Sequence, residues 1–309
     1  MPGPKRSFSG LALRAALVAA VAGGLFFFLR GLDFSALAGA LARASLAPIA
    51  LGIALNFVNV WCKANYWQAM LRPVQHVPVG RLFRYTIASA AGSVLAPARA
   101  GEALRLWFLK QHHGLPLPLS AAVFGMEKLL DLLALLVLLL PLPWLWPERP
   151  PFVGVVVRVL MGVALAAAIA LFVASRNKSL RERALFKGFE LLRHPRSLAR
   201  AFAFVLASWL ADLTVVWLVI VALGIDAPPS AGVLILLAVN LAIAIPAAPA
   251  QAGTLELGAL AAFKLLGLAP GPGLAFALLY HALQVVPILL VGLIDGRRLL
   301  ALASPLEPV

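Results

Sequence analysis

Long apolar stretches recur along the whole chain, and they limit what it can fold into. Segments of about twenty predominantly apolar residues match the roughly 30 Å hydrocarbon core of a bilayer. The composition agrees, because 62% of the residues are hydrophobic, 12% are charged and the mean hydropathy is +0.97. The longest polar stretch, at 175–200, is too short to bury a core of its own. We therefore expect one all-helical, polytopic integral membrane domain over residues 1–309.

The apolar segments predict six full spans and two interrupted regions. The full spans are predicted at about 11–30, 46–71, 119–141, 152–174, 197–223 and 273–294. Two further apolar regions, 82–113 and 230–267, contain proline and glycine near their middles. Because proline removes a backbone donor and clashes with the preceding turn, each region is predicted to form two half-helices in a re-entrant hairpin. The residues at the two breaks are Pro97 and Gly101 in the first region, and Pro249 and Gly253 in the second.

The basic residues fall on one side of this topology. The net charge of +14 comes from residues at the ends of apolar segments, not from basic patches interleaved with aromatic residues, so we expect no nucleic-acid partner. Because a hairpin returns to its starting side, only the six full spans change sides. The positive-inside rule then places both termini and the basic, amphipathic loop at 175–200 in the cytoplasm of a bacterial inner-membrane protein.

The two breaks resemble each other in sequence. "APARAGEAL" at 96–104 aligns with "APAQAGTLE" at 248–256, with Gln251 in the place of Arg99. Three full spans separate the hairpins, so the hairpins open from opposite sides and the repeat is predicted to be inverted. Inverted repeats with broken helices are typical of alternating-access transporters, in which the half-helices meet near the midplane. The alternative is a chance match between segments rich in alanine, proline and glycine.

Ionisable side chains inside apolar segments mark the candidate site, because they are costly unless they are paired or face water. Glu102 and Arg105 follow the first break and share a helical face, on which they can pair. Glu127 and Asp131 share one face of the next span, and Arg99 or Arg105 is the expected cation beside them. The full candidate substrate-binding set is Arg99, Glu102, Arg105, Glu127, Lys128, Asp131, Gln251, Thr254 and Glu256.

Two interpretations of these charges remain open. Arg99 and Arg105, if acids neutralise them only partly, can hold a lipid phosphate through bidentate hydrogen bonds. Alternatively, the charges form ion pairs that hold the hairpin against its neighbours and have no other role. Three further polar residues lie in the spans: Asp212 is a candidate acid, Lys63 is expected to reach the cytoplasmic interface, and His281 is expected to be a hydrogen-bonded core residue.

Three motifs together carry a family resemblance. They are "PARAGEALR" at 97–105, "EKLLD" at 127–131 and "PAQAGTLE" at 249–256, in this order. They resemble the flippase-like transmembrane domain of lysylphosphatidylglycerol synthases and its stand-alone relatives. The resemblance covers nearly the whole chain and implies a protein that moves lipids or lipid-linked intermediates between leaflets. The soluble aminoacyl-transferring domain of the full synthases is not found in these 309 residues, so we expect that the chain does not make lysyl-lipid itself.

Three functions are therefore considered. The first is a flippase-like transporter of a phospholipid or lipid-linked anionic substrate, with membrane lipids as partners and no ATPase, since no phosphate-binding Gly-Lys-Ser/Thr loop is present. The second is an intramembrane enzyme that acts on a lipid phosphate or polyprenyl pyrophosphate, because undecaprenyl-pyrophosphate phosphatases resemble the same inverted-hairpin plan. Ser93 is the nearest hydroxyl to the first break. The third is a membrane scaffold. No nucleophile elbow or His-Glu zinc pair appears, so no catalytic residue, metal or cofactor is expected.

The topology predicts which segments a reagent can reach from each side of the membrane. Cysteines introduced at 175–200 should react with an impermeant thiol reagent only from the cytoplasmic side, and cysteines at 143–151 or 224–230 only from outside. Labelling of intact and permeabilised cells measures this. If the segments around Arg99 and Gln251 both proved to be simple through-going spans, the inverted repeat would be wrong.

Overall fold

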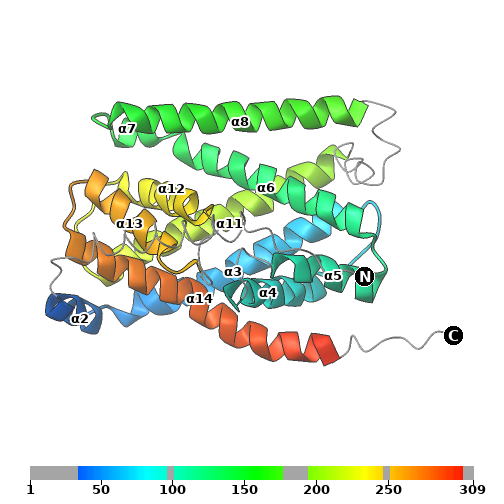
Figure 1. The fold of residues 1–309 in the computed structure, drawn as a ribbon, viewed down its shortest axis with the longest axis horizontal. Helices are drawn as coiled ribbons and strands as arrows, with labels where there is room; N and C mark the ends of the chain where they lie inside the picture. The colour runs from blue at the N-terminus through cyan, green and yellow to red at the C-terminus, as the bar shows by residue number, and fades with distance from the viewer. Residues whose placement is uncertain (1–33, 96–100, 177–193, 246–250, 302–309) are drawn as a thin grey trace, which may run out of the picture.

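The chain is all-helical throughout the part that the structure describes (Figure 1). The computed structural model describes residues 34–95, 101–176, 194–245 and 251–301. The predicted span at 11–30, the break residues Pro97, Arg99 and Pro249, and most of the loop at 175–200 lie outside these residues.

Five long helices run back and forth along the long axis of the molecule (Figure 1). Their bounds are α3 Leu46–Leu71, α6 Leu117–Leu139, α8 Pro151–Arg176, α11 Pro195–Ala222 and α14 Pro270–Ala301. Each occupies the position of a predicted full span. Three helices in the described ranges, α3, α11 and α14 from Pro270 to Asp295, are long and apolar enough to cross a membrane.

Each of the two interrupted regions forms a pair of shorter helices. The first pair is α4 (Val79–Leu95) and α5 (Glu102–His113), and the second is α12 (Ala231–Ile243) and α13 (Thr254–Leu265). Helices α5, α12 and α13 have 12, 13 and 12 residues, well short of the roughly 20 residues of a span. The two helices of each pair contact each other, and the pairs lie toward opposite ends of the long axis (Figure 1). Their relation as an inverted repeat stays a prediction from the sequence.

Two short helices occur where the sequence analysis expected loops. Helix α2 (Phe34–Ala42) is rich in alanine and leucine, which favour helix, and it packs against α14. Helix α7 (Leu142–Leu145) has Pro143 in its first turn, where a missing N–H removes no helical hydrogen bond. Both helices lie at the same end of the long axis as α12 and α13 (Figure 1).

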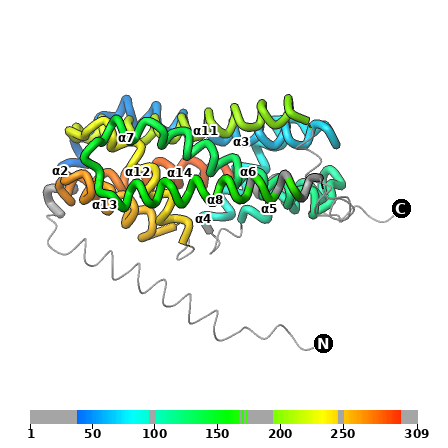
Figure 2. Tube along the Cα trace, turned by 90° about the horizontal axis from the view of Figure 1, so that it is seen from above, coloured from blue at the N-terminus to red at the C-terminus, as the bar shows by residue number. Residues whose placement is uncertain are grey.

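Among the described helices, α3 and α11 form the most extensive contact, and they lie side by side along one edge (Figure 2). Buried amides on α3 join it to its neighbours: Asn59 Nδ2 donates to Ser208 O of α11 at 3.1 Å, and Asn56 Nδ2 donates to Leu283 O of α14 at 2.9 Å. The polar face of α3 is therefore directed into the protein. By contrast, α8 packs mainly against α6 and exposes large apolar side chains such as Val159, as a lipid-facing helix does.

A glycine permits the close approach of α12 and α13. A Cβ atom on Gly258 would lie 2.7 Å from Val239 Cα and 2.8 Å from Ala238 O. These are backbone atoms, so a side chain could not be accommodated by a rotamer change. The second helix pair is therefore packed backbone against backbone at this point.

Replacing Gly258 by alanine should destabilise the protein by about 1–3 kcal/mol, because α12 and α13 must move apart to admit the methyl group. The matched control is Gly125→Ala on α6, where a Cβ atom would meet nothing within 4 Å. That change should be neutral or stabilising by up to about 1 kcal/mol, since alanine favours helix. Thermal unfolding of both variants in detergent measures the difference, and equal melting temperatures would contradict the close packing.

Candidate functional site

A cavity of about 310 Å³ lies between the two helix pairs. Residues of α4 and α5 line it from the first pair, and residues of α12 and α13 with Gln251 line it from the second. Helices α3, α6, α11 and α14 complete the wall. The charged side chains, the amides and the other titratable side chains in the wall are Lys63, Glu102, Arg105, Glu127, Lys128, Asp131, Asp212, Asn240, Gln251, Tyr280, His281 and Gln284.

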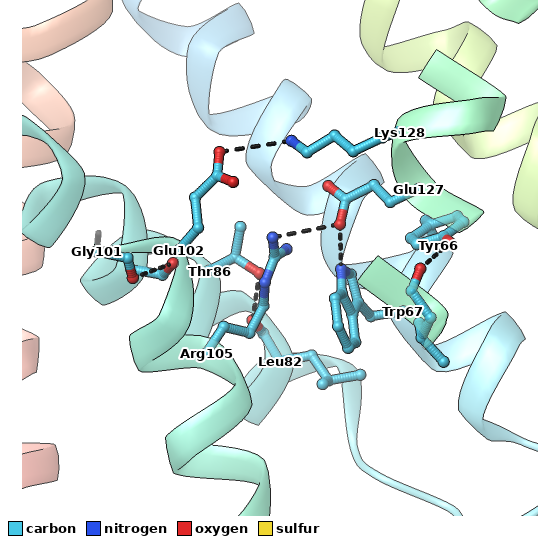
Figure 3. A network of polar contacts seen from close by, with 11 residues as sticks. Tyr66, Trp67, Leu82, Thr86, Gly101, Glu102, Arg105, Glu127 and Lys128 are labelled. Atoms are coloured by element: carbon cyan, nitrogen blue, oxygen red, sulfur yellow. Dashed lines mark hydrogen bonds and ion pairs between the residues drawn. The ribbon is translucent and has the colours of Figure 1, made fainter. Parts of the chain in front are cut away.

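The most deeply buried charges of the cavity form an ion pair between α5 and α6 (Figure 3). Arg105 Nη2 lies 3.2 Å from Glu127 Oε2, and the two side chains are only 5% and 3% exposed. Trp67 of α3 donates its indole N–H to the same Glu127 oxygen at 2.7 Å, and the Arg105 guanidinium lies 4.5 Å from the centre of the indole ring. Arg105 is thus the cation beside Glu127. The ion pair and the cation–π contact with Trp67 hold its guanidinium, and the hydrogen bond from Trp67 holds the Glu127 carboxylate.

A second, more exposed ion pair joins the same two helices. Lys128 Nζ lies 3.4 Å from Glu102 Oε1, with side chains 42% and 25% exposed (Figure 3). The sequence analysis noted that Glu102 and Arg105 can pair along their own helix, and it also expected Arg99 or Arg105 beside Glu127 and Asp131. In the structure, each of them contacts a neighbouring residue of α6, because the shared face of α5 packs against that helix. Two ion pairs therefore join α5 and α6. In one the cation is on α5 and in the other it is on α6.

The remaining charges of the cavity wall come from three long helices. Asp131 accepts a hydrogen bond from Trp209 Nε1 at 3.0 Å, and Asp212 lies 3.5 Å from Gln284 Nε2. Lys63 lines the cavity and interacts electrostatically with both aspartates. The structure thus places Lys63 in the cavity wall, whereas the sequence analysis interpreted it as a side chain that reaches the cytoplasmic interface.

Arg105 has two donors that no group among the described residues accepts. Its Nε and Nη1 atoms are buried and without a hydrogen-bond partner. Buried guanidinium donors are normally satisfied, so two open ones beside a cavity are suited to an incoming anion. Ser93 Oγ, also in the cavity wall, is likewise buried and without a partner.

The glycine of the first break lies in contact with the backbone of α4. A Cβ atom on Gly101 would lie 2.0 Å from Ser93 N, so only glycine fits there. Ser89 Oγ donates to Gly101 O at 2.8 Å and fixes the start of α5 against α4. Charged residues of α5 are thereby placed at the cavity.

The second break is stabilised around Glu256. The N–H of Gly253 donates to Glu256 Oε2 at 2.7 Å, and Glu256 Oε1 lies 2.6 Å from His281 Nδ1. Thr254 donates its hydroxyl to Gln251 O at 2.7 Å. Of the candidate residues in this region, Gln251 lines the cavity, whereas Thr254 and Glu256 lie behind its wall and His281 connects Glu256 to it.

Several residues in or behind the cavity wall were missed by the sequence analysis because they carry no charge at neutral pH. Trp67 and Trp209 supply the donors for the two acids of α6, and Tyr280 accepts a hydrogen bond from Gln284 at 3.0 Å. Amides in apolar spans, such as Asn240 and Gln284, were a usable signal for a polar interior. In the described residues, no group of three or more His, Cys, Asp or Glu side chains is placed to hold a metal ion.

The fold and the cavity define a polytopic, all-helical membrane protein whose two pairs of broken helices surround a charged interior. The chain matches the family described as "Lysylphosphatidylglycerol synthase TM region" over residues 12–292, and it belongs to that family. The resemblance inferred from the three motifs is thereby confirmed. A comparison with curated proteins gives no match.

The two ion pairs between α5 and α6 should differ strongly in their effect on stability. Glu127→Gln leaves Arg105 as an uncompensated buried charge and should lower the free energy of unfolding by about 3–5 kcal/mol. Glu102→Gln disrupts a partly exposed pair and should lower it by less than about 1 kcal/mol. Because the two changes are chemically identical, thermal unfolding in detergent compares the sites directly. Similar losses would show that burial does not set the strength of these pairs.

Proposed function

We propose that the chain is a flippase-like lipid transporter that moves a phospholipid or a lipid-linked anionic substrate between the two leaflets, without an ATPase. One observation carries this proposal. Arg105 is buried in the wall of a central cavity, it is paired with Glu127, and its Nε and Nη1 donors have no hydrogen-bond partner among the described residues. Membership of a family of lipid-related membrane domains supports it.

The substrate group that fits Arg105 is a phosphate. A guanidinium carries five N–H donors in one plane, so Arg105 can give Nη2 to Glu127 and still offer Nε or Nη1, which point to different edges of the group, to an anion. Charge-assisted hydrogen bonds of this kind would replace water around the phosphate as it leaves the membrane surface. A cavity of about 310 Å³ accommodates a lipid head group, while the acyl chains stay in the bilayer.

The two helix pairs are the proposed moving parts. They contribute to one cavity and lie toward opposite ends of the molecule, as expected for an inverted repeat that opens to each side in turn. In this scheme the protein lies in a bacterial cytoplasmic membrane with both termini inside. The turn at 71–79 and the end of α5 face the cytoplasm, and the turns at 139–151 and 222–231 face outside.

An intramembrane enzyme remains the second candidate, and one observation favours it. Ser93 lies in the cavity wall with its hydroxyl buried and without a partner, where a nucleophile for a lipid phosphate would have to be. No described base is hydrogen-bonded to this hydroxyl, which is why we rank the enzyme second. The scaffold hypothesis has no observation in its favour.

The transport proposal predicts that Arg105 matters beyond stability. Arg105→Gln combined with Glu127→Gln removes both charges together, so the fold keeps no unpaired ion while the phosphate donors are lost. Lipid movement should fall about tenfold or more, which corresponds to the loss of charged hydrogen bonds. Arg105→Lys should retain part of the activity, because an ammonium lacks the planar fork. Reduction of fluorescent phospholipids in reconstituted vesicles measures the rate, with folded protein quantified beside it.

The control for this experiment is an arginine outside the cavity. Arg158→Gln removes an exposed arginine on α8, outside the cavity wall, and should leave the rate unchanged. Wild-type activity in the Arg105→Gln, Glu127→Gln double variant would reduce the pair to a structural role. Release of phosphate from polyprenyl pyrophosphate or phosphatidic acid in the same vesicles, abolished by Ser93→Ala, would make the enzyme the better proposal.

A further inference from the structure

In each helix pair, the second helix is joined to the long helix that follows it by charged or ionisable side chains. In the first pair, α5 is joined to α6 by Arg105–Glu127 and Glu102–Lys128. In the second pair, α13 is joined to α14 by the 2.6 Å contact between Glu256 and His281. The two connections differ in chemistry, because arginine and lysine stay protonated at physiological pH, whereas histidine has an ordinary pKa of about 6.5.

The geometry of Glu256 links this contact to the break itself. One carboxylate oxygen accepts the N–H of Gly253 at 2.7 Å, at the first turn of α13, and the other contacts His281 Nδ1. Gly253 has a positive φ of 85°, where the chain enters α13. A change in charge at His281 therefore acts on the residue that fixes the start of the broken helix.

His281 can exchange protons with the cavity. Its side chain is 15% exposed and lines the cavity wall, whereas Glu256, at 9%, lies behind it. Helix α14 packs against α2, α3, α4, α11 and α13. Of the titratable and charged groups on these elements and on α14, Glu256 contacts His281, and Lys63 of α3, Asp212 of α11 and Tyr280 of α14 line the same cavity. Lys264 of α13, and Arg84 of α4 in its ion pair with Asp295, lie outside the cavity wall. Helix α2 carries no ionisable side chain.

We propose that Glu256 and His281 form a proton-binding site, and that proton uptake there strengthens the hold of α14 on the second helix pair and slows lipid movement. In the neutral state, the imidazole donates its Nδ1 proton to the Glu256 carboxylate. Protonation of Nε2 by a hydronium ion from the cavity converts this hydrogen bond into an imidazolium–carboxylate ion pair, with water as the only by-product. The second part of the proposal rests on the lipid transport proposed above, whereas the proton site itself does not.

Proton binding can be measured without any transport assay. The chain has five histidines, so nitrogen NMR of the full-length protein labelled at histidine shows few signals, and His281→Gln identifies those of His281 by their absence. We expect the His281 signals to titrate between about pH 5 and pH 9, the range open to a perturbed histidine, and to shift in Glu256→Gln. His281 signals that stay constant over this range would overturn the proton site.

The effect on transport is measured as the pH dependence of lipid movement in reconstituted vesicles with equal pH on both sides. The wild type should be about fivefold slower at pH 5.5 than at pH 8, because an ion pair holds more strongly than a neutral hydrogen bond. His281→Gln keeps a hydrogen-bond donor that cannot titrate, so its rate should be independent of pH. The matched control is His194→Gln, an exposed histidine before α11, which should keep the wild-type dependence. A pH dependence that survives in His281→Gln would overturn the proposed control by this site.

Failure of this inference differs from failure of the transport proposal. If the wild type moves no lipid at any pH, the transport proposal is wrong. Hydrogen exchange then tests directly whether protonation stabilises the contact between α14 and the second helix pair. The amides of α13 should exchange more slowly at pH 5.5 than at pH 8, after correction for intrinsic rates, in the wild type but not in His281→Gln. Equal protection at both pH values in the wild type would show that proton uptake does not stabilise the contact between α14 and the second helix pair.

Discussion

The hydrocarbon interior offers no hydrogen-bonding partner to an interrupted helix, and the rest of this structure depends on that constraint. A helix that stops inside a bilayer leaves backbone N–H and C=O groups open, so it must be enclosed by protein. In the described residues the long helices pack against both helix pairs, and side chains complete two of the ends: Ser89 Oγ donates to Gly101 O, and Glu256 accepts the N–H of Gly253. The polar cavity follows, because the same interruptions leave room at the centre.

The charges of the interior serve two purposes in this arrangement. Arg105–Glu127 and Lys128–Glu102 each fasten α5 to α6, and Glu256–His281 fastens α13 to α14. For the buried contacts, Arg105–Glu127 and Glu256–His281, the loss of one partner is costly because it leaves an unpaired group in a low-dielectric interior. Such contacts therefore favour two distinct arrangements, made or broken, over a continuous range, which is a useful property at the ends of segments that are proposed to move.

Much of the fold could be predicted from the sequence, because span length and proline breaks are local properties. The bounds of α3 were predicted at both ends, and both interrupted regions divide as expected. The charged residues of the site could be found for the same reason, since an ion in an apolar segment stands out. The partners of these residues could not be predicted, because they depend on how the helices pack. Glu102 contacts Lys128 because α5 lies on α6, and Lys63 points inward because α3 packs on α11.

The close approach at Gly258 has a mechanical consequence. Because α12 and α13 touch through their backbones at Gly258, with Val239 Cα and Ala238 O against the glycine, no flexible side chain separates them at this point. Two helices in backbone contact are expected to move together as a rigid body. A small displacement of the chain at Gly253 would therefore also displace the turn after Leu265. The second helix pair would then move as one body when the chain at Gly253 is displaced, and bending would be confined to the ends of α12 and α13.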